Sequence, residues 1–186
     1  MMPAGRQTGG SQAVGGGREF RLAYHGGTEA VPSPEIRERL HAPDFGKGFY
    51  TAESEEQAVR WARRVRFVRK AAEAVVTAYD VSAIGGGGLA VKVFDGVSEE
   101  WFDAVIACRA GHDVLDGFDV VVGPVADDNV YQTLRFFETG VYSKEEAMRR
   151  LLSERLFNQG VFKTPASLRA LRYVRHGVVA AEGGAS

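Results

Sequence analysis

The sequence predicts an α+β domain built on a split core of two sheets with flanking helices. Strand patterns occur early, helical patterns group in the middle of the chain, and strand patterns return at the end. The regular alternation of strand and helix that marks a doubly wound parallel sheet is absent. A chain of 186 residues can bury one sizeable core. We therefore expect one domain over residues 19–180, between a disordered glycine-rich tail at 1–18 and a disordered C-terminus at 181–186.

Composition narrows the class of protein. Hydrophobic residues make up 45% and charged residues 25% of the chain, as in ordinary globular domains. A formal net charge of -1 argues against a broad electrostatic nucleic-acid binder but permits a local basic face. Cys108 is the only cysteine, so no intrachain disulfide forms and a reducing compartment is favoured. Without an apolar run of about 20 residues or an apolar signal core, we expect a cytoplasmic protein or a delivered effector with no membrane contact.

The first expected strand covers residues 19–24, where apolar and polar side chains alternate, and it ends at the His-Gly-Gly step of 25–27. Three prolines bracket residues 35–40, where the pattern indicates a short helical turn inside a loop. A second short strand is expected at 49–51, directly after a glycine-rich stretch.

A long helix is expected to begin at Ser54, because Gln57 stands three residues later in the position of a capping box. Apolar side chains recur from there at helical spacing, at Ala58, Trp61, Ala62, Val65 and Val68. Five arginines occupy most of the remaining positions, at 60, 63, 64, 66 and 69. Such a cationic helix is either a solvated outer face or a surface that faces a substrate or a phosphate.

The second half of the domain contains further strand patterns at 74–81, 89–94 and 118–125, the last of them typical of a strand buried on both faces. The glycines of 85–88 lack the Lys-Ser/Thr step and the following helix of a phosphate loop. The remaining expected elements are helices from Ser98 to about 111, from Asp127 and Asp128 to 137 and from Ser143 to about 157, a strand at 160–164, a helical turn at 165–171 and a strand at 172–180. Asp127 and Asp128 are either a helix cap or a pair of acceptors near a site.

The candidate site is expected to centre on a stretch at residues 44–52 that contains two glycines. Gly46 and Gly48 flank Lys47, and glycine allows the backbone to adopt a positive φ or to lie close against a ligand. The strand that follows is expected to present Tyr50 to a ligand that lies against the two glycines. A purely structural turn is the alternative interpretation of this stretch.

Tyr24, His25 and Gly26, followed by Phe-Gly-Lys-Gly-Phe-Tyr at 45–50, resemble the ADP-ribosyltransferase superfamily, in the branch of diphtheria toxin and the poly(ADP-ribose) polymerases. Residues 159–164, 166–171 and 173–174 stand in the register of a third signature of that family, a strand, a short helix and a closing strand. The resemblance covers residues 20–174 and implies the split two-sheet fold of that superfamily. Within it the chain looks most like a little-characterised group of bacterial toxin-like proteins that are often encoded beside a small companion protein.

The resemblance implies NAD as co-substrate. An imidazole can bond a ribose hydroxyl, a bare glycine backbone can meet a carboxamide, and a tyrosine face can stack on the cationic nicotinamide ring. The family assigns these roles to His25, Gly26 and Tyr50, so that the two rings of His25 and Tyr50 are expected to close over the same ligand ring. The full set of cofactor-binding residues expected on this basis is Tyr24, His25, Gly26, Gly46, Lys47, Tyr50, Gln57 and Trp61.

Three members of this set have a second interpretation. Trp61 is either a second stacking aromatic or a core residue, and Gln57 is either a carboxamide ligand or a partner in the helix cap. Lys47 either neutralises the pyrophosphate or is simply exposed. No histidine stands at metal-ligand spacing to another or to Cys108, so no metal is expected.

Gln159 is the departure from the family pattern, because the family has a glutamate there as its third catalytic residue. A carboxylate stabilises the positive charge that develops on the ribose, whereas an amide can only orient a hydroxyl by a hydrogen bond. Chain elongation to poly(ADP-ribose) is therefore not expected, while a single transfer is. Glu154 is a poorer match for the glutamate because it falls within the preceding helical pattern.

The function expected from this resemblance is mono-ADP-ribosylation by a bacterial toxin or effector, with His25, Tyr50 and Gln159 as catalytic residues. The acceptor is a macromolecule, protein or nucleic acid, and a small antitoxin is an expected partner. Two alternatives are a catalytically inactive module that binds NAD or ADP-ribose, and an interaction domain without NAD whose arginine-rich helix docks an acidic partner.

Overall fold

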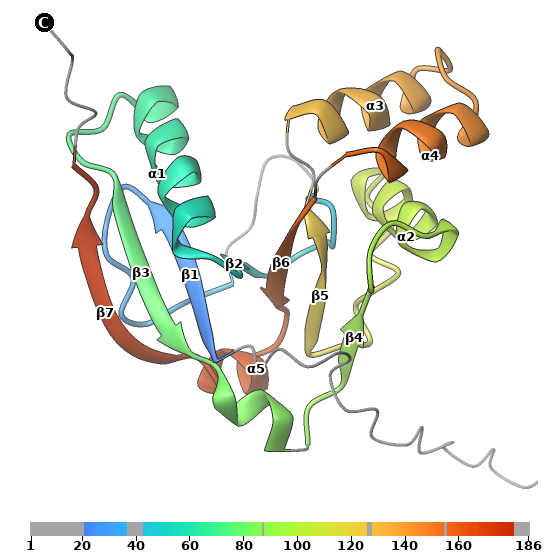
Figure 1. Ribbon diagram of the computed structural model, residues 1–186. Helices are drawn as coiled ribbons and strands as arrows, with labels where there is room; N and C mark the ends of the chain where they lie inside the picture. Colours follow the sequence, from blue (N-terminus) through green and yellow to red (C-terminus); the bar gives the residue numbers. More distant parts are fainter. Residues whose placement is uncertain (1–20, 37–42, 87, 126–127, 155, 181–186) are drawn as a thin grey trace, which may run out of the picture.

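The computed structural model describes residues 21–36, 43–86, 88–125, 128–154 and 156–180. Within them, seven strands form one mixed sheet of order β4-β5-β6-β2-β1-β3-β7 (Figure 1), in which β4 and β5 are parallel and all other neighbours are antiparallel. The strands are β1 Leu22–Gly27, β2 Phe49–Ala52, β3 Val75–Asp80, β4 Val91–Val93, β5 Val120–Val125, β6 Phe157–Phe162 and β7 Arg172–Val178. The expected α+β class is confirmed.

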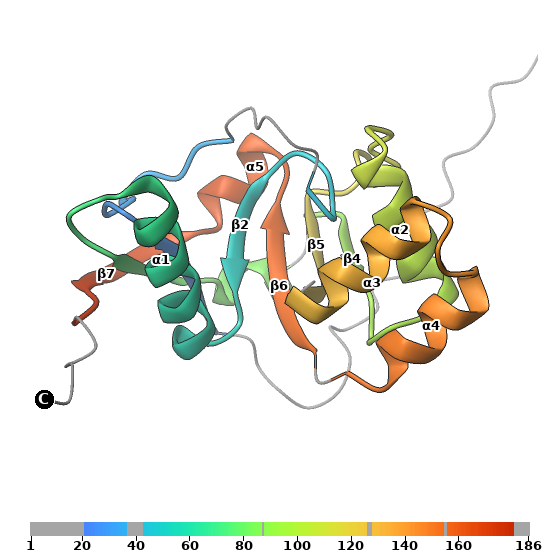
Figure 2. The same cartoon turned by 90° about the horizontal axis from the view of Figure 1, so that it is seen from above.

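Four of the helices lie in two groups on one face of the sheet (Figures 1 and 2), while Leu168 of the short fifth helix packs with Phe49 and Phe162 on the other face. The helices are α1 Glu55–Arg69, α2 Glu99–Arg109, α3 Asp128–Glu138, α4 Lys144–Leu152 and α5 Pro165–Arg169, with a 3-10 turn η1 at Ser82–Gly86. Helix α1 packs on β1 and β3, whereas α2, α3 and α4 pack beside β5 and β6. Both groups cover the same face, since Ala52 beneath α1 pairs with Gln159, and Val161, two residues further along β6, packs beneath the second group.

Local sequence signals account for the helix ends. Ser54, Ser98, Ser143 and Thr164 each accept a hydrogen bond from the backbone N–H three residues later, which satisfies one of the free donors of the first turn. The three serine caps expected from the sequence are therefore confirmed.

The sheet is discontinuous between β1 and β2. Strand β1 pairs with β3 along its whole length, and β2 pairs with β6 at four positions. Between β1 and β2, in contrast, Tyr24↔Ala52 is the one registered pair, although both strands lie wholly within the described residues. The expected core of two sheets is thus a single sheet whose two halves meet at this pair.

Some expected boundaries are wrong. Helix α4 ends at Leu152 instead of near 157, and β6 begins at Phe157 instead of at 160. The reason is that Phe157 pairs with Val125 of β5, a contact that the sequence does not show. Gln159 therefore lies inside the strand. The turn expected at 35–40, the cap at Asp127 and both expected tails fall wholly or partly outside the described residues.

Candidate functional site

A lateral row of side chains crosses the sheet on the face that carries the helices. Pairing places Tyr24 of β1 beside Ala52 of β2, and Ala52 beside Gln159 of β6. The row continues to Ala78 on one side and Gly123 on the other. Paired residues project to the same face of a sheet. The long polar side chains of Tyr24 and Gln159 are therefore separated by Ala52, and a small residue lies on the outer side of each. This row is the centre of the candidate site.

Two glutamine side chains, one in this row and one on α1, each have a buried amide atom without a hydrogen-bond partner among the described residues. Gln159 is only 7% exposed, and its side-chain nitrogen Nε2 is buried without a partner. The side-chain oxygen Oε1 of Gln57, in the first turn of α1, is buried without one as well. A buried polar atom without a partner costs about 1–3 kcal/mol. A ligand that accepts from Gln159 and donates to Gln57 would recover that cost.

One side-chain contact connects helix α1 to strand β6 near this row. The guanidinium carbon of Arg60 lies 4.8 Å from the centre of the Phe157 ring. Arg60 follows Gln57 by three residues and so shares its side of the helix, while Phe157 shares a face of β6 with Gln159. The Arg60–Phe157 contact therefore borders the site.

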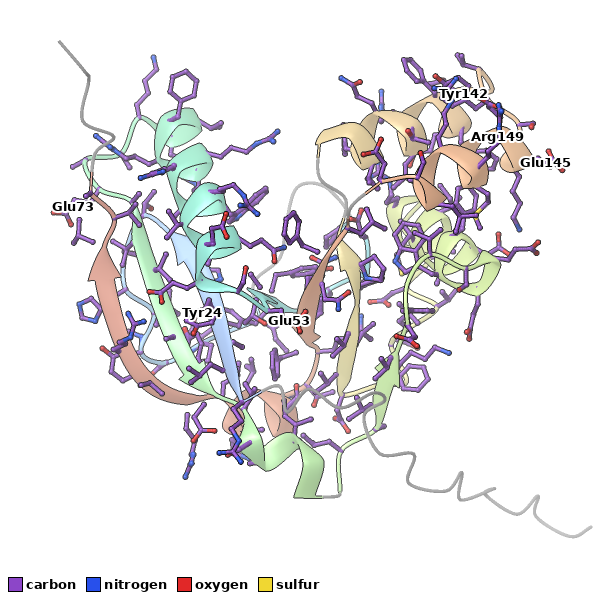
Figure 3. The ribbon with its side chains drawn as sticks, in the orientation of Figure 1. Tyr24, Glu53, Glu73, Tyr142, Glu145 and Arg149 are labelled. Carbon is purple, nitrogen blue, oxygen red and sulfur yellow. The ribbon has the colours of Figure 1, made fainter. Side chains whose placement is uncertain are left out.

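Glu53 brings a carboxylate to the same region. Figure 3 shows Tyr24 below the end of α1 and Glu53 beside β6. The backbone N–H of Glu53 donates to the carbonyl of Asn158 at 3.3 Å, which extends the β2–β6 pairing by one residue. Within the described part of the chain, the Glu53 carboxylate has no hydrogen bond or ion pair. The sequence analysis missed this residue, because the family motif places its carboxylate at the position of Gln159 on β6.

His25 lies on the opposite face of the sheet from Tyr50. Its ring stacks on Phe49, with ring centres 4.6 Å apart, and consecutive residues of a strand project to opposite faces. Its atom Nδ1 makes a hydrogen bond of 2.9 Å with the backbone carbonyl of Tyr50. The expectation that the rings of His25 and Tyr50 close over one ligand ring is therefore wrong. The imidazole instead joins β1 to β2 beyond their last registered pair.

The hydroxyl of Tyr50 makes hydrogen bonds to residues 44–48, which we call the glycine loop. The hydroxyl donates to the carbonyl of Gly46 at 2.7 Å and accepts from the backbone N–H of Phe45 at 3.2 Å. The ring packs against the core beneath α2, α3 and α4. This packing supports a structural role for Tyr50 and not the expected stacking on nicotinamide.

Protein atoms fill the space beside both loop glycines. Gly46 has a positive φ of 75°, as expected, and a Cβ there would lie 2.1 Å from a carboxylate oxygen of Asp113. A Cβ on Gly48 would lie 2.5 Å from Val161. The side chain of Lys47 projects from an exposed position between them. The structural interpretation of Gly46 and Gly48 is the one that this geometry supports.

An ion pair that the sequence analysis missed fixes this loop. The ammonium group of Lys163, which is 3% exposed, donates to both carboxylate oxygens of Asp113, at 2.8 and 3.0 Å, and to the carbonyl of Phe45 at 2.8 Å. Asp113 in turn accepts from the backbone N–H of Lys47 at 3.1 Å. These residues come from three distant parts of the chain, and no motif spacing connects them.

The helix residues expected at the site have different surroundings. Trp61 is 52% exposed, so its interpretation as a core residue is wrong. The backbone N–H of Gln57 donates to Ser54 at 3.2 Å, which confirms Ser54 as the cap, but among the described residues the side-chain oxygen of Gln57 does not make the reciprocal bond of a capping box. A Cβ on Gly26 would lie 2.2 Å from the carbonyl oxygen of Ala58. Glycine at this position thus permits α1 to lie directly on β1.

Neither a metal centre nor a membrane-spanning helix is found among the described residues. Among them, no group of three or more His, Cys, Asp or Glu side chains is placed to hold a metal ion. No described helix has both the length and the apolar character needed to span a bilayer.

The chain is thus an α+β protein in which β1, β2, β6 and the helix after β2 bring polar side chains, among them Gln57 and Gln159, to one face of the sheet. A family model described as a protein of unknown function, DUF3990, matches residues 22–173, and the chain belongs to this family. No curated protein and no solved structure matches the chain.

Proposed function

We propose that this protein binds NAD at the row formed by Tyr24, Ala52 and Gln159 and transfers ADP-ribose to a macromolecule. The proposal rests on one observation above all. The three stretches that resemble ADP-ribosyltransferases, at 24–26, 45–50 and 159–164, include parts of β1, β2 and β6, which are neighbours in the sheet. The buried side-chain nitrogen of Gln159, without a partner in the described structure, adds an independent reason for a ligand there.

The transfer breaks the bond between ribose C1′ and the nicotinamide nitrogen. Its electron pair leaves with nicotinamide, which becomes neutral. An oxygen or nitrogen of the acceptor forms the new bond to C1′ and loses a proton to solvent or a base. The ribose passes through an oxocarbenium-like state, which a nearby carboxylate stabilises.

The residues of the site have distinct roles in this proposal. Gln159 orients a ribose hydroxyl through its amide, and Glu53, the residue directly after β2, supplies a carboxylate. His25 is a positioning residue, because it acts through the Tyr50 carbonyl and the Phe49 ring. Trp61 offers an exposed aromatic face at the edge of the site.

Binding without turnover is a second candidate function. The observation that favours it is the neutral amide of Gln159 at the position where the family has its glutamate. In that case the protein holds NAD or ADP-ribose, and no nicotinamide leaves. The same experiment separates the two functions.

The experiment measures NAD binding by calorimetry and nicotinamide release by chromatography for the wild type, Gln159→Glu and Glu53→Gln. We expect saturable binding and slow release by the wild type. Gln159→Glu restores a carboxylate and should raise release about tenfold or more, whereas Glu53→Gln should lower it by a similar factor. Gln132→Glu, the same substitution at an exposed position of α3, should leave release unchanged.

Three outcomes decide between the candidates. Saturable NAD binding with no nicotinamide release by the wild type, even after long incubation, supports the second candidate function, binding without turnover. Equal release by the Gln159 and Gln132 variants removes Gln159 from the reaction. If NAD neither binds to nor raises the melting temperature of any form of the protein, both functions are rejected.

A further inference from the structure

We infer that the exposed side of α1 binds single-stranded nucleic acid. The surface consists of Arg60, Trp61, Arg64, Phe67 and Val68, which we call the α1 stripe. These residues recur at helical spacing over two turns and lie on the side of α1 away from the buried Ala58 and Ala62.

The α1 stripe exposes large apolar groups that a solvated helix face would not. Phe67 is 85% exposed, Val68 is 70% exposed and Trp61 is 52% exposed. Exposed apolar side chains that cluster mark interaction sites more often than those scattered singly over a surface. The α1 stripe is therefore more than the solvated outer face of an amphipathic helix.

The charge around the α1 stripe is mainly positive, although Arg60 pairs with Glu56 of the first turn at 2.7 Å. Residues 57–72 contain six cations, at positions 60, 63, 64, 66, 69 and 70, and no acid. Cations in the last turn also complement the helix dipole, which explains Arg66 and Arg69 but not the aromatic residues between the cations. On a chain with a net charge of -1, this is a local concentration of positive charge. It favours a negatively charged partner.

The pairing of cations with aromatic rings favours nucleic acid over an acidic protein. The guanidinium carbon of Arg64 lies 5.9 Å from the centre of the Trp61 ring, and that of Arg60 lies 4.8 Å from the Phe157 ring. Bases stack on exposed aromatic and guanidinium planes while phosphates meet the cations. An acidic peptide would satisfy the cations but would bring no flat group for the rings. Only unpaired strands have bases available to stack, so the ligand is single-stranded.

The α1 stripe is continuous with the candidate site. Arg60 contacts Phe157, which precedes Gln159 by two residues on the same face of β6. A strand bound along α1 would therefore pass the row of Tyr24, Ala52 and Gln159. In this respect the inference rests on the proposed function, since it makes a single-stranded nucleic acid the acceptor of ADP-ribose. The binding itself does not depend on NAD.

The test uses the full chain with oligo(U) and oligo(dT) of about 15 nucleotides, near the site size of single-strand binders. Trp61 is exposed and Trp101 is fully buried, so stacked bases should quench the fluorescence of Trp61 alone. We expect quenching and an increase in anisotropy of the labelled oligonucleotide, both weakening as salt rises. The two oligonucleotides separate RNA from DNA as the preferred ligand.

Two variants in the α1 stripe and one outside it locate the surface. Phe67→Ala should weaken binding about tenfold, as expected for the loss of one stacked base, and Arg64→Glu should weaken it at least as much. The control is Arg149→Glu on α4, which belongs to the other helix group (Figure 3). This substitution makes the same change of charge and should leave the affinity for the oligonucleotide within about twofold. The small remaining effect comes from long-range electrostatic interaction, which salt screens. Nicotinamide release in the absence of acceptor should be unchanged in both stripe variants.

Each contrary result has a separate meaning. The inference is overturned if the wild type fails to bind either oligonucleotide at low salt, or if Arg149→Glu weakens binding as much as Arg64→Glu. It is also overturned if a polyglutamate peptide binds while the oligonucleotides do not, because the partner is then an acidic protein. Oligonucleotide binding without NAD binding supports the α1 stripe as a nucleic-acid surface. It rejects the proposed ADP-ribose transfer and, with it, nucleic acid as the acceptor.

Discussion

Lys163 is the residue on which the glycine loop depends most. Its three hydrogen bonds join β6 to the carbonyl of Phe45 and to the carboxylate of Asp113, and the ammonium group is almost fully buried. A methionine would fill the same space without the charge. Asp113 would then keep the backbone N–H donors of Lys47 and Leu115 and the thiol of Cys108.

We expect Lys163→Met to lower the free energy of unfolding by about 2–4 kcal/mol, as when one partner of a largely buried pair is removed. Urea denaturation measures the loss. The matched control is Lys92→Met, whose partner Glu100 is 69% exposed, with an expected loss of about 1 kcal/mol or less. Equal losses in the two variants would contradict the role given to Lys163.

At the scale of elements, the contact between α1 and β1 depends on the absence of a side chain at Gly26. The carbonyl of Ala58 and the amide nitrogen of Ala62 would lie 2.2 and 2.9 Å from a Cβ at that position. Both are backbone atoms of a helix and cannot move separately from it. A side chain at Gly26 would therefore push the whole helix away from the strand.

Gly26→Ala should cost about 1–3 kcal/mol of unfolding free energy, the usual range for overpacking. Gly177→Ala is the matched control, because Gly177 pairs with Val76 on the edge strand β7 and nothing lies within 4 Å of its Cβ position. Its expected change is within about 1 kcal/mol and in the stabilising direction. Thermal unfolding of both variants compares them, and a Gly26→Ala protein as stable as the Gly177 variant would disprove the close contact.

At the scale of the whole molecule, the two halves of the sheet meet where pairing is sparsest. One registered pair, Tyr24↔Ala52, and the bond from His25 to the Tyr50 carbonyl connect β1 to β2. The neighbouring ladders, β1–β3 and β2–β6, contain six and four pairs. Fewer hydrogen bonds make local opening less costly at this boundary than within either half.

His25→Ala should therefore accelerate hydrogen exchange first in β2, residues Phe49–Ala52, while β3 and β7 stay protected. The variant loses both the hydrogen bond and the ring contact with Phe49. Hydrogen exchange followed by mass spectrometry of peptides resolves these segments. Uniform acceleration over the whole sheet would show instead that the two halves open as one unit.

Much of the fold follows from local patterns in the sequence. Ser54, Ser98 and Ser143 begin helices because a hydroxyl that accepts from the third residue onward stabilises the first turn whatever lies around it. The strand at β3 follows from its β-branched and aromatic residues. Boundaries that depend on distant partners, such as the start of β6 opposite Val125, could not be predicted.

The candidate site was predictable only in part. The stretches around His25, Tyr50 and Gln159 were identified in the sequence, and the structure brings their strands together. The direction of each side chain was not predictable, because a one-residue difference in register turns a strand residue to the other face of the sheet. Asp113, Lys163 and Glu53 belong to no local pattern, so only the folded chain reveals their positions.

The sequence by itself determined the class of the fold, the starts of its principal helices and the stretches that make up the candidate site, because these depend on neighbours within a few residues. The tertiary structure alone decided that His25 and Tyr50 lie on opposite faces, that Trp61 is exposed and that the buried side-chain nitrogen of Gln159 has no partner in the described chain. The physical reason is that strand order, register and burial arise from contacts between distant residues, which the sheet forms only when the whole domain folds.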